Sequence, residues 1–400
     1  MVCAAFAAMF LWIIFSHLFI FTKTGDPLGG DFVSFYAASK LALSGHAADA
    51  WHPALHAAAE DSLFKGPHGY LAFFYPPPYL LICWPLALLP YPVALLTWIV
   101  LTLAAALAGV KYYFRTIAPD VRAPILVLIA YPAVWINMGC GQNGALTLAI
   151  FTLGFSLLDK RPIVAGLALG FLVIKPQLAI VLPFVFCLAA LARPALGKTI
   201  FAGGMGALGL CLVSLLIFGT AGFTAFLQNS TYARETLNRG LVDPAIMQST
   251  YAALRLLRVP MGLAYVAQGL VSSVVLTLTC YTAFTCKPNG PALGALIVSA
   301  TLLVTPFLLD YDLLIAALPM GWLVMSGARS GSRPWEKLIV LLVFILPLFS
   351  RKLAMLWHLP IAPIVVLALF ACVLGRVWSE RSQHATQGRL WQTRPEEALP

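Results

Sequence analysis

Long apolar runs follow one another along most of the chain, and charged residues stand mainly between them. The runs lie at about 4–22, 76–110, 122–138, 144–158, 162–174, 176–192, 199–218, 261–285, 291–308, 311–326, 337–350 and 359–376. A helix of about 20 apolar residues crosses a bilayer once, and continuous runs are typical of helices, whereas a membrane barrel needs alternating apolar positions. The pattern predicts an all-α polytopic membrane protein with about 11–13 transmembrane helices.

The run at 76–110 has two interpretations. It contains Pro85, Pro90 and Pro92, and a proline inside a helix kinks or ends it. The stretch is therefore either one crossing preceded by a partial helix or two short crossings.

The composition supports a membrane protein. The chain is 61% hydrophobic and 10% charged, whereas average soluble domains are about 45–50% apolar and about 25% charged. This excludes a soluble globular protein, a disordered chain and a nucleic-acid binder. The net charge of +10 needs no nucleic-acid partner, because cytoplasmic loops of membrane proteins are rich in Lys and Arg. The eight cysteines are scattered without a C-x-x-C motif, which favours small buried residues over a metal site.

The distribution of basic residues predicts the orientation in the membrane. The segments 111–122, 159–161, 193–198, 287, 329–337 and 376–400 hold 15 of the 25 Lys and Arg and 6 of the 15 acids. This excess assigns them to the cytoplasm. If 76–110 makes one net crossing, both termini are cytoplasmic, and the loops at about 23–75 and 219–260 lie outside.

The domain organisation follows from this orientation. Residues 1–376 form one integral membrane domain, and the polar tail 377–400 is expected to be cytoplasmic and disordered. The run 4–22 lacks a basic region before it, so it is interpreted as a retained first helix. In the first outer loop, 32–43 and 53–64 are predicted as short amphipathic helices along the membrane surface.

Carboxylates at two helix junctions are candidates for chemistry. Asp31 follows two glycines and precedes an aromatic-rich helix, so it is either a helix cap or a catalytic base. Asp310 and Asp312 flank Tyr311 at another junction. They either support a site, pair with Lys175 or an arginine, or are simply solvated.

Polar groups inside apolar stretches are a second set of candidates. Gln142 and Asn143 follow glycines between two apolar runs, and such groups are costly in a membrane unless they line a wet cavity. They either bind hydroxyls of a polar ligand or form a tight turn. Lys175 precedes a proline within 162–192, where it either faces an anion or a partner acid, or extends to the surface. Tyr75 precedes three prolines and marks an extended entry into the membrane or an interfacial helix start.

The second outer loop contains basic candidates. Gln248 and Ser249 open an amphipathic helix that carries Arg255 and Arg258. These arginines suit either an anionic head group or the helix C-terminal dipole.

A histidine pattern in the first outer loop has the spacing of a metal site. His52, His56 and Glu60 stand at i, i+4 and i+8, which is compatible with a metal ion. An exposed polar helix face is the commoner cause of this pattern, and no metal site is predicted.

Taken in chain order, several of these segments resemble glycosyltransferase family 87, a family of polytopic GT-C enzymes similar to polyprenyl-phosphate-mannose-dependent mannosyltransferases. The resemblance spans about residues 25–325. It rests on Asp31-Phe32 with Phe35-Tyr36-Ala37-Ala38 and Gly45, Tyr75-Pro76-Pro77 before Pro85 to Pro90, Gly141-Gln142-Asn143, Ala165 to Gly170 running to Lys175-Pro176, Gln248-Ser249, and Thr305-Pro306 with Asp310-Tyr311-Asp312.

The resemblance implies a GT-C-type bundle in the plasma (inner) membrane that moves a sugar from a polyprenyl phosphate to a hydroxyl of a glycolipid or glycan on the outer face, with inversion. Asp31 matches the general base. The residues expected to bind substrate or donor are Tyr36, Tyr75, Gln142, Asn143, Lys175, Gln248, Ser249, Arg255, Arg258, Asp310 and Tyr311. Among them, Lys175 is expected to stabilise the leaving phosphate, with Arg255 or Arg258 in reserve. No metal or other cofactor is expected, because the phosphate leaves as an anion.

One position departs from the family pattern. Tyr311 stands where some mannosyltransferase-like members carry a histidine, so mannose is the default sugar and another hexose or a pentose remains open.

Two other function classes are compatible with the sequence. A lipid-linked-sugar or small-molecule transporter would show broken helices, which are present, and internal repeats, which are absent. A structural membrane subunit would not need Asp31.

Overall fold

The computed structural model describes residues 28–63, 69–122 and 125–392, with side chains as far as residue 382. The predicted first helix at 4–22 lies outside the described residues. The described part is helical, with an isolated bridge between Met247 and Leu309 and no strand. This confirms the prediction of an all-α polytopic membrane protein.

Six described helices are long and apolar enough to cross a membrane. They are α5 (Tyr91–Ile117), α12 (Ala195–Asn238), α14 (Met261–Cys286), the continuous pair η5 (Asp310–Ala316) and α16 (Ala317–Ser330), α17 (Glu336–Trp357) and α18 (Ala362–Gln392).

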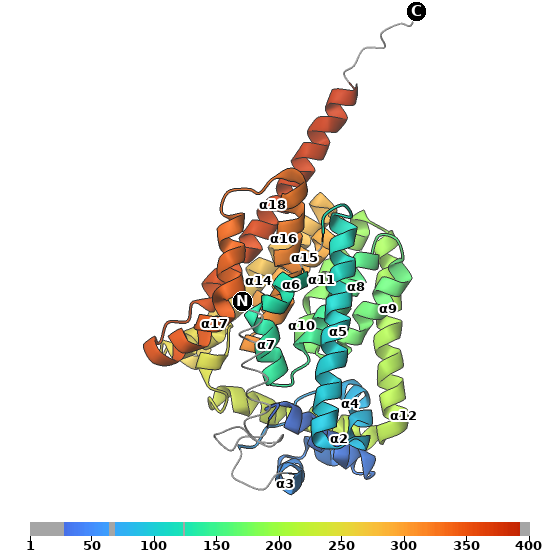
Figure 1. The fold of residues 1–400 in the computed structure, drawn as a ribbon, viewed down its shortest axis with the longest axis vertical. Coiled ribbons are helices and arrows are strands. Elements are labelled where there is room, and N and C mark those ends of the chain that lie inside the picture. Colours follow the sequence, from blue (N-terminus) through green and yellow to red (C-terminus); the bar gives the residue numbers. More distant parts are fainter. Residues whose placement is uncertain (1–27, 64–68, 123–124, 393–400) are drawn as a thin grey trace, which may run out of the picture.

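Shorter helices fill the rest of the described chain (Figure 1). They are α2 (Phe32–Leu43), η1 (Ala47–Trp51), α3 (Pro53–Leu63), α4 (Pro77–Cys83), η2 (Trp84–Leu88), α6 (Ile125–Ala130), α7 (Pro132–Gly139), α8 (Gly144–Leu157), α9 (Pro162–Gly170), η3 (Phe171–Ile174), α10 (Pro176–Ala179), α11 (Val181–Ala192), η4 (Pro244–Ile246), α13 (Thr250–Leu256) and α15 (Gly290–Val304).

The run at 76–110 forms one crossing preceded by a partial helix. The short helices α4 and η2 end before Pro90, and α5 begins at Tyr91 with Pro92 in its first turn. Proline suits this position because the first N–H groups of a helix have no partner within it. Of the two sequence interpretations, the structure therefore selects the single crossing.

Short helices create a recess in the bundle. The 14 residues of α8 span about 21 Å, less than the roughly 30 Å of a hydrocarbon core. The turn that precedes α8 is fixed beside α5, because Trp98 Nε1 donates to Gly141 O at 2.9 Å. Trp98 stands two turns into α5, so this polar turn lies about 10 Å deeper than the start of that helix.

The two predicted surface helices exist, but α2 is not on the surface. Positions 32–39 of α2 are all buried, because aromatic rings cover its sides: Phe32 packs near Tyr91 and Trp98, and Phe35 near Tyr79. The helix α3 is half exposed and buries His56 and Glu60. The expectation of an amphipathic surface helix was therefore wrong for α2.

The chain also differs from the sequence expectation in two segments taken as loop or tail. The backbone of α12 breaks at Gly219, with φ of 71°, and continues helically to Asn238 inside the expected outer loop 219–260. Helix α18 continues to Gln392, where disorder was expected from residue 377. That segment contains Ala, Arg, Gln and Glu without proline before Pro395, and these residues favour helix.

Candidate active site

A cavity of about 700 Å³ opens where the short helices turn. Its walls come from segments far apart in the chain, namely the start of α2, residues 70–76, the turn at 140–142, the junction before α10, the second half of α12 with 241–246, residues 307–312, and Arg351 of α17. Gathering these segments places the three predicted acids, Asp31, Asp310 and Asp312, in one cavity.

Asp31 faces this cavity and does not cap its helix. Its side chain makes no capping hydrogen bond to α2, so of the two sequence interpretations the geometry disfavours the cap. The position is fixed by the backbone: Gly29 and Gly30 have φ of 90° and 42°, values that glycine adopts readily. The N–H of Phe32 then donates to Gly29 O and Cys140 O.

Gln142 holds the Asp31 carboxylate. Its Nε2 donates to Asp31 Oδ2 at 2.7 Å and to Tyr311 Oη at 3.2 Å. Its Oε1 accepts from Tyr75 Oη at 2.9 Å and from Asn143 N at 3.2 Å. The Asn143 bond fixes which end of the amide faces Asp31, since a backbone N–H can only donate and must therefore meet the carbonyl oxygen.

Burial makes Asp31 a stronger base than an ordinary aspartate. Burial raises its pKa, while the Gln142 hydrogen bond and the charge of Lys175 oppose this shift. Burial also raises the pKa of Tyr75 well above its ordinary value. The phenol therefore stays protonated and keeps its hydrogen bond to Gln142.

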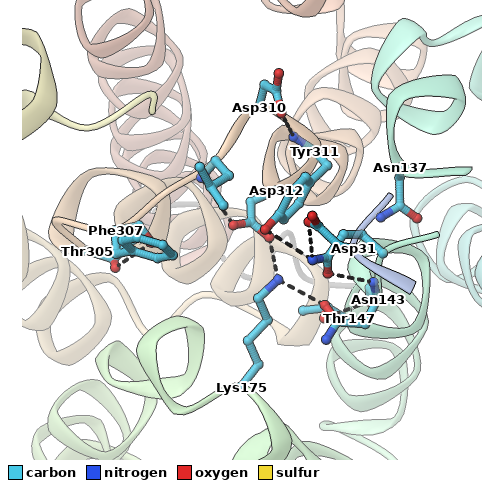
Figure 2. Close-up of polar contacts among 12 residues, drawn as sticks. Asp31, Asn137, Asn143, Thr147, Lys175, Thr305, Phe307, Asp310, Tyr311 and Asp312 are labelled. Atoms are coloured by element: carbon cyan, nitrogen blue, oxygen red, sulfur yellow. Dashed lines mark hydrogen bonds and ion pairs between the residues drawn. The ribbon is translucent and has the colours of Figure 1, made fainter. Parts of the chain in front are cut away.

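Lys175 is paired inside the site. Its Nζ lies 2.5 Å from Asp312 Oδ1, with both side chains about 2% exposed, and it donates to Asn143 Oδ1 at 2.9 Å. Asp312 Oδ2 accepts from the N–H of Leu309. Figure 2 shows the ammonium group between Asp312 and Asn143. Among the sequence alternatives for Lys175 and Asp312, the ion pair is the one observed.

Arg351 lines the cavity and was missed by the sequence analysis. Its NH1 lies 3.5 Å from Asp310 Oδ2, and Asp310 Oδ1 accepts from the N–H of Tyr311. The available signal was the basic pair Arg351-Lys352 after the apolar run 337–350, on the predicted outer side.

Aromatic residues that the sequence did not single out form another part of the wall. Tyr70, Phe74 and Tyr232 line the cavity, and the rings of Phe74 and Tyr232 lie 6.1 Å apart. They come from two different loops of the predicted topology, so only the fold brings them together.

Six predicted binding residues lie outside the cavity wall. Asn143 is buried, and its Oδ1 accepts from Lys175 Nζ. Tyr36 Oη donates to Leu89 O, Gln248 pairs through its backbone with Leu308, and Ser249 caps α13. Arg255 donates to the carbonyl of Val259, and Arg258 is exposed after α13. Direct contact between these residues and a ligand in the cavity has no support in the geometry.

The His52, His56 and Glu60 pattern does not form a cluster of ligands. His56 Nδ1 lies 3.7 Å from Glu60 Oε1 and both side chains are buried, whereas His52 is exposed. Across the described ranges, no group of three or more His, Cys, Asp or Glu residues is placed to hold a metal ion.

Comparison with known proteins identifies the family. Neither the curated proteins nor the solved structures contain a match to the chain. The model of glycosyltransferase family 87 matches residues 73–306, which include Gln142, Asn143 and Lys175 of the site. Because this match covers more than half of the sequence, the chain belongs to glycosyltransferase family 87.

Proposed function

We propose that this membrane glycosyltransferase moves a hexosyl residue, mannosyl by default, from a polyprenyl-phosphate sugar to a hydroxyl of a glycolipid or glycan on the outer face of the membrane. The proposal includes a GT-C-type arrangement, inversion at the sugar and Asp31 as general base. The observation that carries it is the Asp31 carboxylate, which faces a 700 Å³ cavity and is held by Gln142.

The proposed step is a single displacement. An oxygen of Asp31 takes the proton from the acceptor hydroxyl while the acceptor oxygen forms a bond to the anomeric carbon of the sugar. The bond between that carbon and the phosphate oxygen breaks, and its electron pair stays on the phosphate. A carboxylate is competent for this role when it lies within hydrogen-bond reach of the hydroxyl. Protonated Asp31 and an anionic polyprenyl phosphate result, and the configuration at the anomeric carbon is inverted.

The surrounding polar groups keep the base in place. Gln142 is itself fixed by Tyr75 and Asn143, so the Asp31 carboxylate has a preorganised partner. Lys175 neutralises Asp312 and orients Asn143. No metal ion is assigned to the proposed step, because the phosphate leaves as an anion without being protonated.

The family match favours this reaction over the transporter alternative. A transferase needs a base for its acceptor hydroxyl, and Asp31 supplies a carboxylate that is held by the Gln142 amide. Substitution of Asp31 separates the two functions.

The test is sugar transfer by the purified protein in liposomes, with a panel of labelled polyprenyl-phosphate sugars and a native lipid extract as acceptor. Asp31→Asn is expected to lower transfer by roughly 10²–10⁴-fold, the usual contribution of a general base. Because burial raises the Asp31 pKa, wild-type transfer should fall on the acid side at a pH above the ordinary aspartate value.

Asp49→Asn is the matched control. Asp49 lies in the same outer segment and outside the cavity wall, so its loss should leave transfer unchanged. Equal transfer by Asp31→Asn and wild type, with equal thermal unfolding midpoints, would remove Asp31 as the base.

A further inference from the structure

The cavity contains little unused positive charge. Among its described lining residues, the basic ones are Lys175 and Arg351. An anionic leaving group is stabilised by a cation that is already in place. An anion in the cavity can therefore pair with Lys175 or with Arg351.

The ammonium group of Lys175 already has its partners within the protein. It is in contact with Asp312 and Asn143, and the Lys175 side chain is about 2% exposed. Moving it toward a ligand would leave the Asp312 carboxylate buried without its partner, which is strongly unfavourable. Its charge is balanced within the wall of the cavity.

Arg351 has capacity to bind an anion. Its side chain is 51% exposed, and its contact with Asp310 is at 3.5 Å, longer than a hydrogen bond between charged groups. A guanidinium has five N–H donors, and no hydrogen bond from Arg351 reaches another residue that the structure describes. Asp310 keeps a second partner, the N–H of Tyr311, so it remains oriented if the guanidinium turns toward a ligand.

The location of Arg351 connects it to the base. It lies on α17 one turn after Pro347, and α17 packs against α7 and η5. The η5 segment carries Asp310 and Tyr311, and Tyr311 Oη shares the Gln142 amide with Asp31. Arg351 and Asp31 thus line one cavity. They are linked through three residues of its wall, Asp310, Tyr311 and Gln142. The family match ends at residue 306, so this arginine stands outside the matched region.

We propose that Arg351 is the residue that binds the phosphate group of the donor and stabilises the prenyl phosphate as it leaves. This inference rests on the donor class of the proposed function. The planar donors of Arg351 match two phosphate oxygens at once. Asp310 holds the guanidinium at the cavity when no ligand is present.

Binding can be measured without catalysis. The full-length protein in phosphatidylcholine nanodiscs is titrated with farnesyl phosphate, farnesol and inorganic phosphate. Wild type should bind farnesyl phosphate more tightly than farnesol by roughly 10- to 100-fold, the effect of hydrogen bonds to a charged group. Arg351→Gln should abolish this preference, and Arg351→Lys should retain part of it.

Lys352→Gln is the matched control, since Lys352 is the adjacent exposed basic residue of α17 and does not line the cavity. It should keep the preference for farnesyl phosphate. An equal loss in Lys352→Gln, or no loss in Arg351→Gln, would overturn the proposal. Inorganic phosphate bound as tightly as farnesyl phosphate would also overturn it, because the site would then not be one for a lipid-linked phosphate.

The two proposals fail in different ways. Asp31→Asn should bind farnesyl phosphate like wild type and transfer no sugar, whereas Arg351→Gln should raise the donor KM and lower kcat with an unchanged thermal unfolding midpoint. Arg351-dependent binding combined with normal transfer by Asp31→Asn would contradict only the assigned base. Normal donor KM and kcat in Arg351→Gln would contradict only the phosphate site.

Discussion

Lys175 and Asp312 illustrate at the residue scale how a charge is held inside this bundle. Each side chain is about 2% exposed, and the two lie 2.5 Å apart. Asn143 and the N–H of Leu309 satisfy further polar atoms of the pair. The pair joins the junction before α10 to η5, and both segments line the cavity.

Lys175→Met is expected to destabilise the protein by about 3–5 kcal/mol, because it leaves the Asp312 carboxylate buried without a counter-charge. The double variant Lys175→Met with Asp312→Asn should recover much of this loss. Arg239→Met, which breaks an exposed pair with Glu235, should cost less than about 1 kcal/mol. Thermal unfolding midpoints in detergent measure the relative stability of the three variants. Equal midpoints for the two single variants would contradict the argument.

Sequence alone located much of the candidate site, for a physical reason. Asp31, Gln142 and Lys175 are polar groups at or within apolar stretches, where an unpaired polar group is costly. Arg351 was missed because a basic residue after an apolar run has the pattern of an ordinary helix end. Residue type also does not tell which side of an element a side chain faces. Arg255 was therefore included, although it donates to the carbonyl of Val259 in the segment after its own helix.

At the scale of elements, the buried side chains of His56 and Glu60 connect α3 to two segments that line the cavity. His56 Nε2 lies 3.1 Å from Ser34 O on α2, and Glu60 Oε2 accepts from the N–H of Leu71. Ser34 and Leu71 both line the cavity. Burial lowers the pKa of His56 to about 4 and raises that of Glu60 to about 8.

Because of Glu60, the free energy of unfolding of the protein should fall as the pH rises from about 6.5 to about 8. In this range Glu60 is ionised in the unfolded chain and neutral in the folded one, so the unfolded state binds fewer protons and a higher pH favours it. Between about pH 4.5 and 6.5, His56 is protonated in the unfolded chain and neutral in the folded one. Its contribution to stability therefore rises with pH in this range and offsets the fall caused by Glu60. The expected decrease above pH 6.5 is roughly 2 kcal/mol.

Glu60→Gln should remove this decrease, because the amide keeps an acceptor for Leu71 and does not ionise. The unfolding midpoint of wild type and variant is measured at pH 6.5 and pH 8. A decrease of the same size in the variant would show that another group is responsible.

Elements were predictable where local pattern decides them. The helices at 32–43 and 53–64 follow from their start and stop residues, and both exist. The burial of α2 could not be predicted from its own pattern. It depends on Tyr91 and Trp98, which belong to a helix some 60 residues later in the chain. The 76–110 run stayed ambiguous because its prolines mark possible helix breaks, and the sequence does not tell which of them ends a helix.

At the scale of the whole molecule, the turns that were assigned to the cytoplasm meet at one end of the bundle. Arg193 pairs with Asp159 and donates to Pro288 O, and Arg329 donates to Ile117 O. A buried Arg376–Glu336 pair joins the start of α17 to α18. The candidate site lies at the other end, beside α2 and α3 (Figure 1). We propose that the end opposite the site is the cytoplasmic one, as the excess of basic residues predicts.

This orientation predicts which positions a membrane-impermeant maleimide reaches in spheroplasts of cells that express the protein. Ser44→Cys, exposed after α2, should be labelled, whereas Ser332→Cys, exposed between α16 and α17, should be labelled only after lysis. The variants are made in a chain whose native cysteines are replaced by alanine, because Cys187 is itself exposed. The reverse pattern would place Asp31 and Arg351 on the cytoplasmic side, and the proposed transfer on the outer face would then be wrong even if the chemistry of the site were correct.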